Sequence, residues 1–226
     1  MRKLLYVPII HMEPDLGSEA TAIASKSSSL FGEKRWAKHK ESVAKFWERI
    51  ADYFTTIDAS TLKIYQDGLP ADGALGRKIV EEAAKRGSKN HQIILSLMAR
   101  GAEISKTEDP SLLQEEYEYI TRLTRSRSIP EKTIASARYK LRKNQLTKER
   151  DKFVAKTIDE TLKEGETGVL FMGSYHNIFP YLPKDIVVKQ LKNREKINAY
   201  FRELVSGGDG ERFEQLAKYL ASPYVA

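Results

Sequence analysis

The stretch GVLFMGSYH at residues 168–176 joins a short apolar run to a glycine, Gly173, and then to a histidine, His176. A short apolar run that is bounded by a turn signal is typical of a buried strand. The run LLYVPII at residues 4–10 has the same form, because it ends directly at His11. Two of the four histidines of the chain therefore follow predicted strands.

The same patterns predict further strands at residues 62–66, 102–107 and 185–191. Helical spacing of apolar residues predicts helices at residues 33–54, 74–86, 89–100, 111–124, 193–205 and 210–221. Residues 16–32 are rich in Gly, Ser and Ala and are expected to form a loop or a short helix. Pro130 predicts the start of one more helix, which runs toward Gly165 with a break near residues 144–147.

Strands that alternate with helices predict an α/β fold, with a mostly parallel central sheet of about five strands and helices on both faces. A chain of 226 residues is long enough for one large domain. We therefore expect a single α/β domain over residues 1–226, with a mainly helical middle section at residues 111–165.

The composition is that of a packed, well-solvated globule, with 41% hydrophobic and 31% charged residues. The absence of cysteine excludes disulfides, thiolate zinc sites and cysteine nucleophiles. The first apolar run is interrupted by Pro8 and is too short for a signal peptide. No apolar stretch approaches the roughly 20 residues that a membrane helix needs. We expect a cytoplasmic protein without a membrane span.

Positive charge is concentrated between Arg122 and Lys152, where eleven Lys/Arg stand against three acids, while the net charge of the whole chain is +7. One interpretation is a solvated helix face whose basic residues pair with the acid-rich segment at residues 108–120. The other is a basic segment, residues 122–152, that docks nucleic acid or an acidic partner. We favour the first interpretation, because Tyr139 is the only aromatic residue within the segment.

Parallel strands end at one edge of their sheet, and ligands of open α/β folds bind at that edge. His11, Asp67 and His176 all come just after predicted strands, as do Glu108 and Asp109. Arg150 shares a helical i, i+4 line with three apolar residues and is expected to reach the same edge. The candidate site is therefore His11, Asp67, Arg150 and His176, whereas His39 and His91 are predicted to lie on the surface.

The segment RDKFVAKTIDETLKEGETGVLFMGSYH at residues 150–176 resembles the signature of the TraB/Tiki, ChaN and erythromycin-esterase-like superfamily. In that superfamily an arginine-led helix precedes a strand that ends in G-x-x-H, which Gly173 and His176 match. The first histidine motif reads PIIH here, with Pro8 where the superfamily has glycine. Asp67 corresponds to the acidic residue after the second strand. The resemblance implies an EreA/ChaN-like α/β fold with these side chains in a cleft at the strand ends.

The resemblance also implies several chemistries. The Tiki branch looks like metal-dependent proteases, the erythromycin-esterase relatives activate water with a histidine, and the ChaN-like members are associated with haem. Two mechanisms stay open for a hydrolase that acts on a small molecule or a peptide. In the first, His11, His176 and either Asp67 or a nearby glutamate hold a divalent metal ion. In the second, a histidine is the general base and Arg150 stabilises the oxyanion. The alternative function is a non-catalytic binding protein that docks its partner through residues 122–152.

Overall fold

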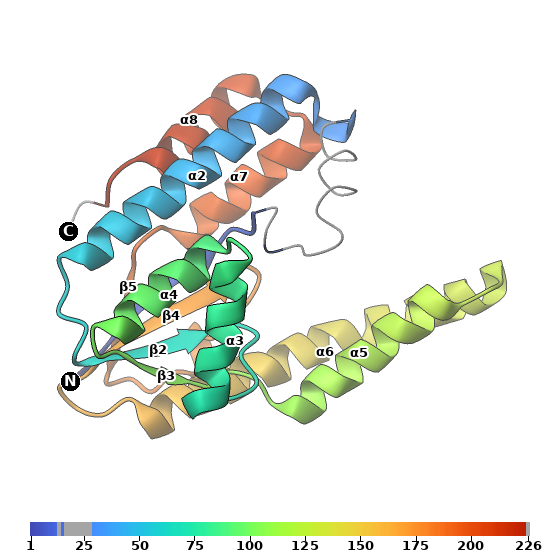
Figure 1. The fold of residues 1–226 in the computed structure, drawn as a ribbon. Helices are drawn as coiled ribbons and strands as arrows, with labels where there is room; N and C mark the ends of the chain where they lie inside the picture. The colour runs from blue at the N-terminus through green and yellow to red at the C-terminus, as the bar shows by residue number, and fades with distance from the viewer. Residues whose placement is uncertain (13–14, 16–28, 225–226) are drawn as a thin grey trace.

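The computed structural model describes residues 1–12, 15 and 29–224, and it shows a five-stranded sheet flanked by helices (Figure 1). All neighbouring strands are parallel, in the order β3-β2-β4-β1-β5. The strands are β1 (Arg2–Ile9), β2 (Leu62–Gln66), β3 (Glu103–Ser105), β4 (Thr167–Gly173) and β5 (Ile186–Gln190). The predicted α/β fold is confirmed. Most of the predicted loop at residues 16–32 lies outside the described residues.

The central strands β1 and β4 are apolar on both faces, because the sheet is covered on both sides. Successive side chains of a strand point to opposite faces. Leu5 and Val7 of β1 therefore enter one core cluster, whereas Leu4 and Tyr6 enter the other. This double burial explains why these strands are continuous apolar runs and do not alternate between apolar and polar residues.

Helices cover the two faces unequally. The larger core cluster lies under five helices: α2 (Glu33–Thr55), α3 (Gly73–Lys85), α4 (Lys89–Ala99), α7 (Arg194–Ser206) and α8 (Gly210–Ala221). The smaller cluster lies under the second half of α6 (Ile129–Thr161), which contributes Val154 and Ile158. No helix among the described residues is both long and apolar enough to cross a membrane.

The middle of the chain forms a helical hairpin of α5 (Pro110–Arg125) and α6, which extends away from the sheet (Figure 1). The predicted break at residues 144–147 was wrong, because α6 continues through this segment and buries Leu146. Neither Pro nor Gly occurs there to interrupt the helical hydrogen bonds. The helix ends at Thr161, four residues before Gly165.

Candidate functional site

Gly173 ends β4 and allows the carboxylate of Asp67 to lie against the strand end. The backbone N–H of Asp67 donates to the carbonyl of Phe171 (2.8 Å), and Asp67 Oδ2 accepts from the N–H of Gly173 (3.0 Å). A Cβ atom at position 173 would lie 3.3 Å from the same Oδ2. A contact this short forces one of the two groups to move, so glycine keeps the carboxylate close to the backbone.

His176 emerges from the turn after β4 and is oriented by Asp151 of α6. Its Nδ1 lies 2.5 Å from Asp151 Oδ1, and the other oxygen of Asp151 accepts from the backbone N–H of Asn177 (2.9 Å). On the opposite side of the ring, Nε2 lies 3.9 Å from Asp67 Oδ2. The imidazole is therefore held between two carboxylates, with its side chain 13% exposed.

The pKa of His176 reflects two opposing effects. Burial lowers it, whereas the hydrogen bond to Asp151 and the negative charge of Asp67 raise it. The carboxylates prevail, and the pKa lies above the ordinary value of 6.5. The imidazolium form is thus stabilised in the folded protein, which is the form a histidine takes after it has accepted a proton from a substrate or from water.

Arg150 lies at this edge, where it binds carboxylates. Its guanidinium forms a bidentate ion pair with Glu108 and a further ion pair with Glu116 (3.0 Å), and it lies 3.7 Å from Asp67 Oδ1. The side chain of Glu108 is only 1% exposed, and burial raises its pKa although Arg150 opposes the shift. Three carboxylates therefore surround one guanidinium. We infer that Arg150 holds Asp67 and Glu108 in position and does not bind an oxyanion.

A pocket of about 290 Å³ opens beside Asp67. His11, which follows β1, lines this pocket with a side chain that is 63% exposed, and its Nδ1 lies 3.9 Å from Asp15 Oδ2. His176 does not line it, so Asp67 is the residue that links the two predicted histidines. All the lining residues but one are polar or charged: His11, Asp15, Gln66, Asp67, Ala83, Arg86, Ser88, Asn90 and His91.

His91, which was predicted to lie on the surface, is partly buried and also lines this pocket. Its Nδ1 lies 2.8 Å from Ser88 Oγ, and burial lowers the pKa of the ring. Ser88 Oγ donates to Asn90 Oδ1 (2.6 Å), and Asn90 Nδ2 donates to Gln66 Oε1 (3.1 Å). Gln66 Nε2 donates to the backbone carbonyl of Asp67 (2.9 Å). This chain of buried and partly buried hydrogen bonds fixes the pocket wall relative to Asp67.

The prediction that His39 lies on the surface was wrong, since this residue is only 6% exposed. It lies in α2, far along the chain from the strand ends, where its ring stacks on Trp36 and its Nδ1 forms a hydrogen bond with the Tyr200 hydroxyl (2.9 Å). Burial lowers its pKa to about 4. His39 is therefore a neutral core residue, and it takes no part in the candidate site.

The predicted metal ligands do not form a ligand set. Among the residues that the structure describes, no group of three or more His, Asp or Glu side chains is arranged to hold a metal ion. His11 faces Asp15, and His176 uses Nδ1 for its hydrogen bond to Asp151. The described side chains thus do not fit the expected set of His11, His176 and Asp67, and we derive no step through a metal ion.

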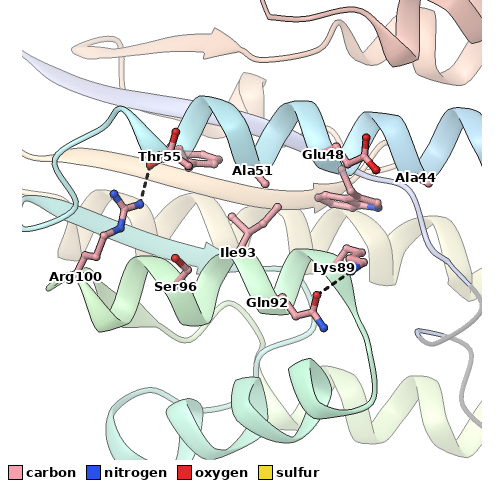
Figure 2. A pocket seen from close by; sticks show the side chains of 11 residues that line it. Ala44, Glu48, Ala51, Thr55, Lys89, Gln92, Ile93, Ser96 and Arg100 are labelled. Carbon is pink, nitrogen blue, oxygen red and sulfur yellow. Dashed lines mark hydrogen bonds between the residues drawn. The ribbon is translucent and has the colours of Figure 1, made fainter.

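A second pocket, of about 540 Å³, lies between α2 and α4 (Figure 2). Trp47, Phe54 and Ile93 line its apolar wall. At its rim, Arg100 donates to the carbonyl of Phe54 (2.7 Å) and Lys89 to the side chain of Gln92 (3.1 Å). None of the candidate site residues lines it, so it is separate from the strand-end site.

Three site residues were not predicted from the sequence: Asp151, Glu116 and His91. A signal existed for Asp151, because it lies on the same helical stripe as Val154, Ala155 and Ile158, all of which are buried. The ion pair with Glu116 depends on how the α5–α6 hairpin closes, which no local pattern shows.

The resemblance to the TraB/Tiki, ChaN and erythromycin-esterase-like superfamily stays a prediction: comparison with protein-family models, curated proteins and solved structures found no match to this chain.

Proposed function

We propose that this protein is a hydrolase in which His176, oriented by Asp151, activates water for attack on an ester or amide carbonyl of a small molecule or peptide. The observation that carries this proposal is the 2.5 Å contact between His176 Nδ1 and Asp151 Oδ1, which leaves Nε2 directed toward Asp67. The pair lies at the carboxyl edge of a parallel sheet, where α/β folds bind their ligands.

The geometry supports a general-base role for His176. A carboxylate that accepts from Nδ1–H selects the tautomer in which Nε2 is free to accept a proton. Nε2 and Asp67 Oδ2, 3.9 Å apart, are spaced so that one water molecule can contact both at about 2.8 Å. Nε2 then takes a proton from this water as its oxygen attacks the carbonyl carbon. The imidazolium, stabilised by Asp151, returns the proton to the leaving group.

Asp67 supplies a second reason to place the substrate here. Its Oδ1 is buried and accepts no hydrogen bond from the described residues, and the Arg150 guanidinium lies 3.7 Å away, beyond hydrogen-bond distance. A buried acceptor without a partner costs free energy, and a donor on a bound substrate would remove that cost. The polar pocket beside Asp67, with His11 and Arg86 in its lining, suits a polar substrate.

The test compares two carboxylates of the same helix. Asp151→Asn and His176→Gln are assayed with a panel of generic ester and peptide substrates beside Asp159→Asn, which removes a half-exposed carboxylate that pairs with Arg2 outside the site. We expect the two site variants to lose roughly 100-fold or more in kcat/KM, the scale of general acid–base catalysis. The control should keep full activity, and thermal melting should show that all three are folded.

The pH profile adds a readout that a merely structural role would not change. Activity of the wild type should rise with pH through a pKa above 6.5, because Nε2 must be unprotonated. Asp151→Asn removes the hydrogen bond that raises the pKa, so its residual activity should rise at lower pH than that of the wild type. A folded His176→Gln protein with full activity would overturn the proposal, as would a wild type that cleaves no substrate in the panel.

A further inference from the structure

The net positive charge of the chain arises in the far part of the α5–α6 hairpin. Residues 119–143, called the arm tip below, contain eight Lys/Arg and one acid, so they carry +7, which equals the net charge of all 226 residues. The remainder of the chain is therefore balanced in charge. A local field of this kind attracts polyanions over distances comparable with the Debye length, about 8 Å in physiological salt.

Acids of α5 and α6 pair with two of the eight cations of the arm tip, Arg122 and Arg142, and with Arg150 nearer the sheet. Glu115 and Glu149 both pair with Arg142, while Glu116 pairs with Arg150. Toward the tip, the pair between Arg122 and Glu118 (3.4 Å) is largely exposed. Six further cations form no ion pair with any carboxylate that the structure describes: Arg125, Arg127, Lys132, Arg138, Lys140 and Lys143. The predicted pairing with residues 108–120 thus holds for Arg150 at the base of the hairpin and, within the arm tip, for Arg122 and Arg142.

The arm tip is accessible, because the hairpin stands away from the sheet (Figure 1). No residue of α5 is buried, and the first buried residue of α6 is Leu146. The two helices contact each other through a half-buried seam, in which the ring centroids of Tyr119 and Tyr139 lie 6.1 Å apart. The cations of the arm tip therefore lie on a hairpin that protrudes into solvent.

Three arginines line one groove of the hairpin. The groove has a volume of about 340 Å³ and is lined by Tyr119, Arg122, Arg125, Ser126, Glu131, Ile134, Ala135 and Arg138. Guanidinium is planar and matches the geometry of phosphate oxygens with paired N–H donors. Arg122, Arg125 and Arg138 therefore form a cluster suited to phosphate groups, beside an aromatic ring on which a base can stack.

We propose that the arm tip docks on the phosphate backbone of a nucleic acid. The distribution of the cations around α6 favours this partner over one acidic helix or a flat anionic membrane. At about 100° per residue, Lys132 and Lys143 share one line, Lys140 lies about 80° from it, and Arg138 lies about 120° from it in the other direction. A partner that contacts only one face of α6 would leave some of these cations without a contact. A second copy of the chain is disfavoured, because two tips of +7 repel each other.

Binding is measured by fluorescence anisotropy, with the full-length protein and a labelled single-stranded RNA of about 20 nucleotides, over a range of salt concentrations. We expect affinity to fall steeply with salt. The variant Arg122→Gln/Arg125→Gln/Arg138→Gln should bind at least about tenfold more weakly in 0.1 M salt, with a log–log salt slope that is shallower by about 2. Arg142 and Arg150 are retained, so their ion pairs with Glu115, Glu149 and Glu116 stay in place.

A matched control removes the same charge elsewhere. Lys40→Gln/Lys78→Gln/Lys85→Gln changes three exposed lysines of α2 and α3 and should bind like the wild type. Equal losses in the two triple variants would overturn the proposal, since net charge alone would then explain binding. A wild type that does not bind the RNA or a duplex DNA in low salt would also overturn it. Binding to polyglutamate or to phosphatidylserine vesicles without binding to either nucleic acid would assign the tip to an acidic protein or to a membrane, and would reject it.

Discussion

His39 and His176 are two enclosed imidazoles whose pKa values move in opposite directions. His39 lies in the layer of α2, α7 and α8, where its Nδ1 meets the neutral hydroxyl of Tyr200, and burial lowers its pKa to about 4. His176 lies at the carboxyl edge of the sheet, where its Nδ1 meets the carboxylate of Asp151, and its pKa is raised. The comparison teaches that the charge of the partner decides the outcome. Burial acts in the same direction on both rings.

The largest expected effect comes from removing the cation beside His176. Arg150→Met would leave the buried carboxylate of Glu108 without its partner and the carboxylate of Asp67 without a neighbouring cation. We expect the free energy of unfolding to fall by about 3–5 kcal/mol in urea denaturation, as for other broken buried ion pairs. The pKa of His176 should rise further, because Arg150 opposes the two carboxylates.

A matched arginine provides the control for that experiment. Arg122 pairs with Glu118 in an exposed i, i+4 arrangement on α5. Arg122→Met should change the free energy of unfolding by less than about 1 kcal/mol. Equal effects of the two substitutions would contradict the assignment of Arg150 as the residue that holds the carboxylates at the strand ends.

The second-largest effect is a loss of folding stability at low pH that arises from His39. The unfolded chain binds a proton at this residue near pH 6.5, whereas the folded protein does so only near pH 4. The contribution of a neutral His39 is therefore present above pH 6.5 and is lost as the pH falls through 4. The total loss is about 3 kcal/mol from a shift of this size. Urea denaturation of the wild type at several pH values measures it.

His39→Gln isolates this contribution, because glutamine keeps a hydrogen-bonding group near Tyr200 and does not titrate. The variant should be less stable than the wild type at pH 7, and the difference should shrink as the pH is lowered toward 4. A difference that stays constant over this range would show that His39 does not have the lowered pKa described above.

A smaller effect is expected from Gly173→Ala. The added methyl group would lie 3.3 Å from Asp67 Oδ2, so the carboxylate must shift by a few tenths of an ångström. We expect a loss of about 1 kcal/mol in the free energy of unfolding. Catalytic activity should fall more than stability suggests, because Asp67 moves relative to His176. Gly210→Ala is the control, since a Cβ atom there meets nothing within 4 Å.

The fold followed from the sequence wherever local patterns are sufficient. The apolar runs of β1 and β4 and the apolar spacing of α2 were predicted nearly to the residue, because double burial and amphipathic packing leave direct marks in the sequence. The continuity of α6 was not predicted. Its residues 144–147 have weak apolar periodicity, and the helix is supported there by Leu146 and by the ion pairs of Arg142 with α5.

The site was predicted in part. The predicted parallel topology placed His11, Asp67 and His176 after strands that end at one edge of the sheet. It could not show which of these side chains would be in contact. The structure joins Asp67 to His176 and, through the pocket, to His11. The partner of His176 and the three carboxylates around Arg150 depend on the position of α6 against the sheet, which is set by tertiary packing and leaves no short-range signal.

The central claim is that Asp151 orients His176 and raises its pKa, and an NMR titration of the imidazole resonances tests it most directly. In the wild type we expect the pKa of His176 to lie above 6.5 and that of His39 near 4. In Asp151→Asn the pKa of His176 should fall, because Asp67 is then the only carboxylate that opposes the effect of burial. The pKa of His39 should be the same in this variant as in the wild type. In the control Asp159→Asn, the imidazole resonances should titrate as in the wild type. A His176 pKa at or below 6.5 in the wild type, unaffected by Asp151→Asn, would contradict the account.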